Sequence, residues 1–552
     1  MRAATFLAVS LLILDYIFVA PDAYGTFFLG KTTIVIYWML EVFFLSGSRL
    51  IYRYFRYSRT LTRTNTAGAT PALIVGRTAD VEVLLRSIES GAVKNLRPVG
   101  IISPSIADRG QLIRGVSVVG IIEDLPGVLQ DFSKRERPIQ RLVLTPSAFE
   151  PASEPESVLK LARKLGLMVS QLPSLEEHRG MPRLAPIAIE DLLLRPSAKI
   201  NYENLETLIK NKAVIVTGGG GSIGSEICDR VIAFGAARLL IVENSEPALY
   251  AVTENLSGGS QQVIIEGRIA DIRDRDRMFA LMQEFKPDLV FHAAALKHVP
   301  ILERDWTEGV KTNIFGTINV ADAAAAAHAE AMVMISTDKA IEPVSMLGLT
   351  KRFAEMYCQM LDRERAARRS GGSAMRLISV RFGNVLGSNG SVVPKFKAQI
   401  EAGGPVTVTH PDMVRYFMTI REACDLVISA AVHALTTDGG DDVSVYVLNM
   451  GQLVKIVDLA ERMIKLSGLE PHKDIDIAFT GMRQGERLHE ILFAEGEPTR
   501  DIGVPGVMAA VPMEPKAEAM RSWIASLEKT VAAEDRTAIR SLLKQAVPEF
   551  KT

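Results

Sequence analysis

The sequence predicts an α/β protein in which two parallel-sheet units follow an N-terminal helical hairpin. Three observations support this fold class. Two long apolar runs open the chain, short runs rich in Val, Ile and Leu alternate with helical stretches after residue 70, and four consecutive glycines follow one of these runs. A length of 552 residues allows several domains with sizeable cores.

The composition excludes several classes of protein. The net charge is −1, so the chain has no overall basic bias and we expect no nucleic-acid partner. The three cysteines, Cys228, Cys358 and Cys424, lie far apart and belong to no Cys/His pattern with metal-ligand spacing. We therefore expect neither a disulfide framework nor a metal site.

Residues 1–60 predict a hairpin of two membrane helices. Residues 3–20 are apolar apart from Asp15, and residues 32–51 form an apolar run, interrupted by Glu41, of about 20 residues, which is long enough to cross a bilayer. A cleavable signal peptide is the alternative for the first run, but its internal charge argues against one. By the positive-inside rule, the arginines after the second run place the rest of the chain in the cytoplasm. These are Arg49, Arg53, Arg56, Arg59 and Arg63.

Residues 70–180 predict the first sheet unit. The runs "PALIVG", "LRPVGIIS", "GVSVVG", "IQRLVLTP" and "LGLMVSQL" alternate with helical stretches, as in βαβ units with a parallel sheet. Only Gly76 follows the first run, whereas close approach to a pyrophosphate needs further glycines. We predict a Rossmann-like domain with a degraded nucleotide site, and favour a regulatory or structural role over cofactor binding.

A second unit, residues 195–512, carries a stronger pattern. In "AVIVTGGGGSIGSEICDRVIAFG", Gly218 permits a tight turn, Gly221 lets the backbone approach phosphate, and Gly224 lets the helix pack close to the strand. The helix N-terminus then offers N–H groups to a pyrophosphate. The residues expected to bind a dinucleotide here are Thr217, Gly218, Gly221, Ser222, Ile223 and Gly224.

The following strands complete a predicted cofactor cleft. The next strand ends in Glu243, whose carboxylate suits the ribose hydroxyls and would repel a 2′-phosphate, so NAD is favoured over NADP. Of His292 and His298, we expect one in the core and the other lining the cleft, rather than a metal site. Further candidate cofactor contacts are Asp271, Ile272, Ala293, Ala294, Ala295, Asn313 and Lys351.

Eight motifs carry a resemblance to a known family. They are "VTGGGGSIGSE", "HAAALKHVP", "STDKA", "GLTKR", "RFGNVLGSNGSVVP", "VTHPDMVRYFMTI", "NMGQLVKIVDLA" and "GMRQGERLHE", in order from Val216 to Glu490. The chain resembles the CapD/WbpM-like membrane-bound polysaccharide biosynthesis proteins, which are NDP-sugar 4,6-dehydratases of the extended short-chain dehydrogenase/reductase superfamily. Two departures stand out. Family members typically have four membrane spans, whereas this chain has at most two, and Leu347 occupies the position of a catalytic Tyr, or of Met in the large membrane-bound branch.

The resemblance implies a location, a substrate and a fold. It implies a multi-pass protein of the bacterial inner membrane with a cytoplasmic catalytic domain, whose partners are the lipid bilayer and a nucleotide-diphosphate sugar. UDP-GlcNAc is the default sugar nucleotide, in surface polysaccharide or glycan biosynthesis. The fold would be a doubly wound extended short-chain dehydrogenase domain with a small C-terminal substrate lobe. We interpret residues 513–552 as a helical tail that provides a packing or oligomer surface, and we expect a homo-oligomer.

The implied reaction assigns roles to the segment from Thr337 to Lys351. Asp338 is the candidate acid at C6, Lys339 the candidate base at C5, Thr337 a hydrogen-bond partner of the C4 oxygen, and Lys351 a ligand of the nicotinamide ribose. We expect burial to bring the pKa values of Asp338 and Lys339 toward neutrality. With Leu347 in place of Tyr, the C4 proton acceptor is Thr337, Asp338 or a water near Lys351.

Predicted substrate contacts lie mainly toward the C-terminal end of the second unit. Two arginines suit a diphosphate through paired hydrogen bonds, and Glu486 suits the nucleotide's ribose. The candidates are Lys297, Asn384, Ser391, Arg415, Arg483 and Glu486.

Two other functions remain open from the sequence. A nucleotide-sugar 4-epimerase shares the fold and oxidises C4, but it needs no paired C5 base and C6 acid, so Asp338 and Lys339 favour dehydration. A non-catalytic membrane-bound nucleotide-sugar sensor or scaffold is the other alternative, and Leu347 is the residue that supports it.

Overall fold

The computed structural model describes two compact units, Met1–Leu194 and Arg195–Thr552. The described residues are 69–149 without 92, 94–95 and 135–138, and 198–551 without 258–262, 368–374, 437–442 and 468. Scattered positions are also described, at 10, 13, 33, 35–40, 43, 44, 47, 158, 162, 167–172 and 185–186.

The predicted membrane hairpin at residues 1–60 lies almost entirely outside the described residues. Within the described part of the chain, no helix combines the length and the apolar character that crossing a bilayer requires. The longest helix described there, α13 (Met346–Ala367), has 22 residues but carries charged side chains such as Lys351 and Glu355, whereas a span needs about 20 predominantly apolar residues. This finding corrects the prediction of a multi-pass, inner-membrane protein.

The described residues of the first unit form a seven-stranded sheet in the order β3-β4-β2-β1-β5-β6-β7. Strands β4, β2, β1, β5 and β6 run parallel, and β3 and β7 are antiparallel additions at the two edges. The strands are β1 (Thr70–Val75), β2 (Leu96–Ser103), β3 (Leu112–Ile113), β4 (Val116–Ile121), β5 (Arg141–Leu144), β6 (Met168–Gln171) and β7 (Ala185–Pro186), with helices α3 (Thr78–Glu89) and α4 (Leu125–Lys134).

The described part of the second unit contains a nine-stranded sheet in the order β10-β9-β8-β11-β12-β13-β17-β21-β20. The strands from β10 to β17 are parallel, and β21 and β20 are antiparallel. The strand order reverses between β8 and β11, which is where ligands bind in open α/β sheets. The strands are β8 (Ala213–Thr217), β9 (Arg238–Glu243), β10 (Ile264–Ile269), β11 (Leu289–His292), β12 (Ala331–Ile335), β13 (Arg376–Arg381), β17 (Val445–Leu448), β20 (Thr499–Asp501) and β21 (Val507–Ala510).

Helices cover both faces of this sheet because side chains alternate along each buried strand. Ile215 of β8 belongs to one core cluster, together with residues of α9, α12 and α13, whereas its neighbours Val214 and Val216 belong to a second cluster, with residues of α6, α7, α8 and α15. The helices are α6 (Tyr202–Ile209), α7 (Ser222–Ala233), α8 (Glu246–Ser257), α9 (Arg275–Phe285), α10 (Val299–Leu302), α11 (Trp306–Gly309), α12 (Thr317–Ala326) and α15 (Ile420–Thr436).

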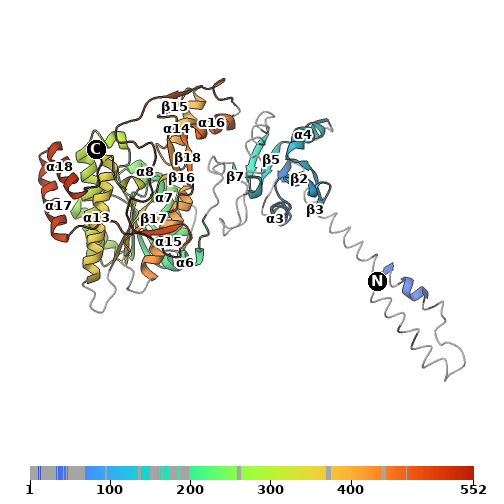
Figure 1. The fold of residues 1–552 in the computed structure, drawn as a ribbon. Coiled ribbons are helices and arrows are strands. Elements are labelled where there is room, and N and C mark those ends of the chain that lie inside the picture. The colour runs from blue at the N-terminus through green and yellow to red at the C-terminus, as the bar shows by residue number, and fades with distance from the viewer. Residues whose placement is uncertain are drawn as a thin grey trace. The chain divides into compact units, whose positions relative to one another are not determined.

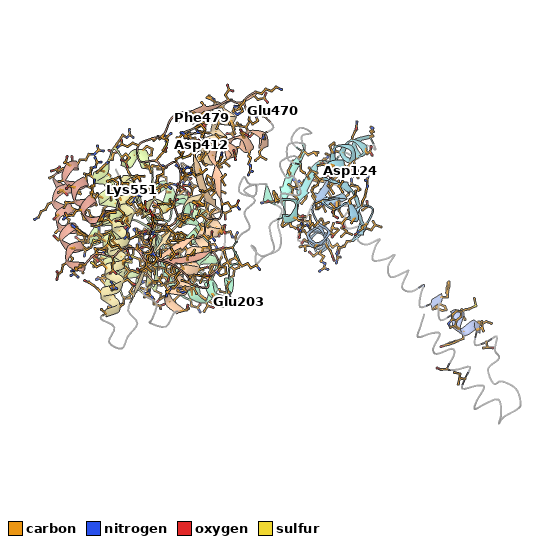
Figure 2. All side chains as sticks on the ribbon, viewed as in Figure 1. Asp124, Glu203, Asp412, Glu470, Phe479 and Lys551 are labelled. Carbon is orange, nitrogen blue, oxygen red and sulfur yellow. The ribbon has the colours of Figure 1, made fainter. Side chains whose placement is uncertain are left out.

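A small lobe gathers at one end of the second unit (Figure 1). It contains the sheets β14-β16-β18 and β15-β19. Phe479, at the end of β19, is exposed on this lobe (Figure 2). The elements are β14 (Asn384–Val385), α14 (Val392–Glu401), β15 (Val406–Val408), β16 (Val414–Met418), β18 (Leu453–Lys455), α16 (Ile456–Leu466) and β19 (Ile477–Phe479).

The C-terminal helices α17 (Ala517–Ala532) and α18 (Arg536–Ala546) pack onto the second unit. Met520, Leu527, Ile539 and Leu543 are fully buried and share a core cluster with Phe353 of α13. Figure 1 shows both helices beside α13. The tail therefore extends the core of this unit.

Candidate active site

The glycine turn between β8 and α7 is so tightly packed that side chains do not fit. Gly218 has a positive φ of 70°, and a Cβ there would lie 2.6 Å from the backbone of Ala294. A Cβ on Gly224 would lie 2.1 Å from the carbonyl oxygen of Gly218. Gly221 precedes α7, and no described side chain caps it there, so the first N–H groups of the helix remain available to a ligand.

Residues around the turn hold it in place. Thr217 is buried, and its hydroxyl lies 2.8 Å from Nδ1 of His292, the last residue of β11. Ser222 accepts a hydrogen bond of 3.0 Å from the backbone N–H of Asn389. Ile223 is half-buried and packs against the core. The turn is therefore braced by β11 and by the segment that precedes α14.

Glu243 lies at the end of β9 and faces the glycine turn. Its carboxylate accepts hydrogen bonds from the backbone N–H groups of Gly220 (3.0 Å), Asn244 (3.0 Å) and Ser245 (3.1 Å). These contacts fix a negative charge beside the turn, which suits ribose hydroxyls and disfavours a 2′-phosphate.

Asp271 and Ile272 follow β10. Partial burial favours the neutral acid, but hydrogen bonds and charge from Arg273 outweigh it and lower the pKa of Asp271. The Arg273 Nη2–Asp271 Oδ2 distance is 2.5 Å. Ile272 is buried and lies against Gly316, where a Cβ would approach it to 2.5 Å.

The segment after β11 lines the other side of the turn. Ala293, Ala294 and Ala295 are half-buried there. Asn313 is buried in a π-helical turn (Val310–Gly316), where its Oδ1 accepts from the N–H of Leu296 at 2.9 Å and its Nδ2 donates to the Leu296 carbonyl at 3.1 Å. Asn313 therefore holds this loop through its side-chain amide.

The two histidines occupy different environments. His292 is buried, and its Nε2 lies 3.0 Å from the hydroxyl of Thr317. Burial, together with the positive charge of Lys351, lowers the pKa of His292 to about 3, so the ring is neutral. His298 is exposed and lies against Gly390, where a Cβ would lie 2.5 Å from the ring.

Lys351 lies in the second turn of α13, one turn after Leu347. Its Nζ donates to the carbonyl oxygen of Ile335, the last residue of β12, at 2.8 Å. Burial lowers the pKa of Lys351 to about 8, against the opposing charge of Glu355. Leu347 is buried in the core, so its position offers no group for proton transfer.

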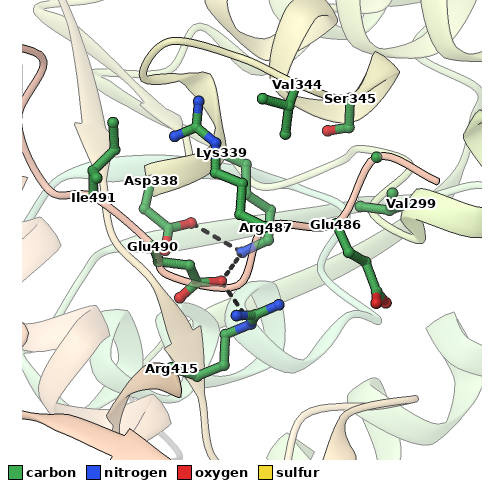
Figure 3. A pocket seen from close by; sticks show the side chains of 11 residues that line it. Val299, Asp338, Lys339, Val344, Ser345, Arg415, Glu486, Arg487, Glu490 and Ile491 are labelled. Atoms are coloured by element: carbon green, nitrogen blue, oxygen red, sulfur yellow. Dashed lines mark hydrogen bonds and ion pairs between the residues drawn. The ribbon is translucent and has the colours of Figure 1, made fainter. Parts of the chain in front are cut away.

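Asp338 and Lys339 lie in a 3₁₀ turn (Asp338–Ala340) directly after β12. The Nζ of Lys339 lies 3.0 Å from Asp338 Oδ1 and 2.8 Å from Glu490 Oε1 (Figure 3). The hydroxyl of Thr337 donates to Asp338 Oδ1 at 2.9 Å. Asp338 Oδ2 is buried and has no hydrogen-bond partner among the described residues, so this oxygen remains available for a ligand.

The charge of Lys339 differs from the sequence prediction. Burial by itself favours the neutral amine, but the carboxylates of Asp338 and Glu490 outweigh it and raise the pKa of Lys339 above its ordinary value. The expected shift toward neutrality is therefore wrong for Lys339 in the absence of substrate, because two carboxylates contact one ammonium.

Glu490 is a candidate functional residue that the sequence analysis missed. Burial and the nearby charge of Asp338 raise its pKa to about 7, although Lys339 and Arg415 oppose this shift. The Nε of Arg415 lies 3.1 Å from Glu490 Oε1 (Figure 3). Glu490 ends the motif "GMRQGERLHE", but its partner Lys339 is 151 residues away, so spacing gives no indication of the contact.

The acid–base cluster lines a cavity of about 150 Å³. Polar and apolar side chains from the β12 end and the small lobe surround it in Figure 3. The lining residues are Val299, Asp338, Lys339, Val344, Ser345, Arg415, Gly485, Glu486, Arg487, Glu490 and Ile491.

The predicted substrate residues divide into two groups. Arg415 and Glu486 line the cavity, and Asn384 Nδ2 lies 3.4 Å from Glu490 Oε2. Like Asn384, the other three are outside the lining: Lys297 and Arg483 are exposed, and Ser391 precedes α14 with its buried hydroxyl unpaired among the described residues. Arg487, four residues after Arg483, lines the cavity instead, which the spacing did not indicate.

Known proteins match the second unit by itself and also a longer part of the chain. A family model described as "Polysaccharide biosynthesis protein" matches residues 214–512. The capsular polysaccharide biosynthesis protein CapD of Staphylococcus aureus is 37% identical over 466 residues, 83% of this chain and 74% of that protein.

Two enzymes match the second unit at similar levels. The UDP-N-acetylglucosamine 4,6-dehydratase (inverting) of Campylobacter jejuni is 31% identical over 293 residues, 52% of this chain and 80% of the enzyme. The UDP-glucose 4-epimerase of Rickettsia rickettsii is 31% identical over 292 residues, 52% of this chain and 79% of the enzyme. The resemblance inferred from the motifs is thereby confirmed, and the chain belongs to the polysaccharide biosynthesis protein family.

Proposed function

We propose that the protein is an NAD-dependent NDP-sugar 4,6-dehydratase that acts in surface polysaccharide or glycan biosynthesis. The observation that carries this proposal is the contact between Asp338 and Lys339, at 3.0 Å, on the wall of a cavity of about 150 Å³. Dehydration needs an acid and a base on neighbouring carbons of the sugar, and this pair can supply both.

The residues around the glycine turn fit NAD. Gly218 and Gly224 allow the tightly packed turn, Gly221 carries no side chain where a pyrophosphate would approach the N-terminus of α7, and Glu243 suits an unphosphorylated ribose. When bound, NAD supplies hydride chemistry, by removing hydride from C4 of the sugar and delivering it to C6. Lys351 would hold the nicotinamide ribose, as the sequence resemblance implies.

Thr337 and Asp338 provide a route for the C4 proton. Leu347 cannot take this proton, but the Thr337 hydroxyl already donates to Asp338 Oδ1 at 2.9 Å. The C4 hydroxyl proton would pass through Thr337 to Asp338. Asp338 would then be the neutral acid that C6 requires.

Lys339 and Asp338 carry the elimination. The C4 ketone acidifies the C5–H bond, and the Lys339 amine takes that proton. Asp338 gives its proton to the C6 hydroxyl, which leaves as water. When hydride has reached C6, Lys339 returns a proton to C5. The sugar thus loses one water and becomes a 4-keto-6-deoxy sugar.

A mass-resolved product assay on a panel of NDP-sugars, beginning with UDP-GlcNAc, tests this proposal. We expect a product lighter than the substrate by one water. A product of unchanged mass would instead identify a 4-epimerase. Tight NAD binding without turnover of any sugar nucleotide would favour a non-catalytic sensor or scaffold.

A further inference from the structure

The positive charge of Lys339 at rest conflicts with its proposed role as a base, and Asp338 cannot remove that charge. Lys339 must be a neutral amine to take the C5 proton, yet its Nζ contacts two carboxylates, Asp338 at 3.0 Å and Glu490 at 2.8 Å. In the proposed dehydration, Asp338 already holds the proton from C4. The proton of Lys339 therefore needs a different acceptor.

We propose that Glu490 accepts the Nζ proton of Lys339 during turnover and returns it afterwards, an inference that rests on the proposed dehydration. Glu490 Oε1 lies 2.8 Å from Lys339 Nζ, which is within hydrogen-bond reach for direct transfer. The Glu490 side chain is only 4% exposed. The acceptor is therefore shielded from water, whereas the Lys339 side chain is 28% exposed.

Contacts from the small lobe fix the orientation of the Glu490 carboxylate. Arg415 of β16 lies 3.1 Å from Oε1, and Asn384 of β14 lies 3.4 Å from Oε2. Figure 3 shows Glu490 between Lys339 and Arg415. The carboxylate therefore faces the base from the small lobe, and Glu490 acts on the reaction through Lys339, as a positioning residue.

The charges around Glu490 suit a temporary proton acceptor. Burial and repulsion by Asp338 raise its pKa to about 7, against the attraction of Lys339 and Arg415. Two further titratable groups feel its charge, Tyr416 of β16 and Arg487. The part of this rise that comes from ionised Asp338 is lost once Asp338 is protonated, but burial, the largest cause, persists and still favours the protonated carboxyl of Glu490.

Neutralisation of Asp338 weakens the hold of Lys339 on its proton, although it also removes the repulsion that Asp338 exerts on the Glu490 carboxylate. While Asp338 is ionised, it and Glu490 together stabilise the Lys339 ammonium. When the C4 proton reaches Asp338, Lys339 loses one of these two negative partners. Its remaining ionised partner is Glu490, in direct hydrogen-bond contact.

The proton balance closes over one cycle. An N–H bond of Lys339 breaks and an O–H bond forms on Glu490. The free amine then takes the C5 proton, while Asp338 gives the former C4 proton to the departing hydroxyl. After hydride has reached C6, Lys339 returns its proton to C5 and Glu490 returns the stored proton to Lys339. The proton that leaves in the water is the one lost by the C4 hydroxyl.

The variant Glu490→Gln should separate oxidation at C4 from the elimination of water. Glutamine has nearly the same size and can still accept a hydrogen bond from Lys339, but it cannot accept the proton. We expect the full-length variant, given NAD and the sugar nucleotide that the wild type dehydrates, to reduce NAD by oxidising C4. Dehydration should fall about 10²-fold or more, and in D₂O the sugar should gain no deuterium at C5. Lys339→Ala should show the same separation.

Two comparisons distinguish this role from a structural one. Glu490→Asp should restore part of the C5 exchange. Glu486→Gln removes another carboxylate from the cavity lining, and we expect it to raise KM while C5 exchange per turnover persists. In the wild type, dehydration should decline as pH falls through about 7, because a protonated Glu490 cannot accept, and the residual activity of Glu490→Gln should lack this decline.

Three results would overturn the inference. If Glu490→Gln dehydrates at the wild-type rate, the proton goes elsewhere. If the variant loses C4 oxidation together with dehydration, Glu490 only maintains the structure. If the wild type dehydrates no NDP-sugar, the proposed function fails and this inference fails with it, whereas the first two results leave the proposed function intact.

Discussion

Both sheet units contain a turn that connects the first parallel strand to the following helix. The two turns differ in whether side chains of the protein bond to them. In the first unit, Gly76 follows β1, and Ser147 of the same unit bonds to the turn. The N–H of Arg77 donates to Ser147 Oγ at 2.8 Å, and Asp80 accepts from the N–H of Ser147 at 3.0 Å. A carboxylate in the first turn of α3 also repels phosphate. In the second unit, the glycine turn keeps its helix N-terminus free of any described side-chain cap.

On the basis of this difference, we predict that the first unit binds no dinucleotide although it contains a parallel sheet like that of the second unit. Both units have buried central strands and helices that follow them. The turn decides whether a pyrophosphate can approach, because binding depends on unpaired N–H groups and on the absence of side chains. We therefore retain a structural or regulatory role for the first unit as a proposal.

The largest expected effect concerns the segments directly after two other parallel strands, β12 in the second unit and β5 in the first. β12 leads to Lys339, whereas β5 leads to Ser147, which bonds within its own unit. Lys339→Ala should lower the dehydration rate about 10²- to 10⁴-fold, because it removes the proposed base, while NAD affinity is retained. Ser147→Ala should leave turnover unchanged. Steady-state kinetics on both variants measure the contrast, and full activity of Lys339→Ala would refute its role.

The glycines of the two turns provide the second contrast. Gly218→Ala places a Cβ 2.6 Å from the backbone of Ala294 and should weaken NAD binding roughly 10- to 100-fold, the cost of local overpacking. Gly76→Ala places a Cβ 1.7 Å from Thr145 Oγ1, which strains the first unit. It should not change NAD affinity. Calorimetric titration of NAD distinguishes them, and equal losses in both variants would show that the first unit also contributes to cofactor binding.

A smaller effect is expected at Glu243. Glu243→Gln removes the charge that we propose faces the cofactor ribose, so the preference for NAD over NADP should fall about tenfold, as for loss of one hydrogen bond to a charged group. Parallel titrations with the two cofactors measure this ratio. An unchanged preference would mean that a residue other than Glu243 discriminates between NAD and NADP.

The smallest effect concerns the turn of the first unit. Asp80→Asn weakens the bond from the Ser147 N–H and should destabilise the first unit by about 1 kcal/mol. Hydrogen exchange on the full-length protein should then show faster exchange around residues 145–149 and unchanged exchange at the glycine turn. Faster exchange in the second unit would contradict independent behaviour of the two turns.

Several features of the site were predictable from local sequence. The glycines at 218, 221 and 224 follow a buried strand, and their spacing is readable because a tight turn excludes side chains. Asp338 and Lys339 are adjacent in the chain, so their contact follows from the strand end that carries them. The structure does not support the predicted membrane hairpin in the same way. The hairpin lies mostly outside the described residues, and no described helix is suited to cross a bilayer.

Other features depended on contacts between distant segments. Arg487 lines the cavity, whereas Arg483, the predicted ligand, lies outside the lining, and its contact with substrate stays a prediction. The amide of Asn313 bonds to the loop at Leu296, and its contact with a cofactor stays a prediction. Spacing along the chain did not indicate either contact, because both depend on how distant segments fold together.

The sequence by itself determined the α/β class, the family and the position of the glycine turn, because strand periodicity and glycine geometry are local properties. Only the tertiary structure decided the charge of the cavity. It brings Glu490 to within 2.8 Å of Lys339 across 151 residues and buries both carboxylates that contact the ammonium. Charges interact through space and burial strengthens them, so the pKa values of Lys339 and Glu490 belong to the fold rather than to either segment alone.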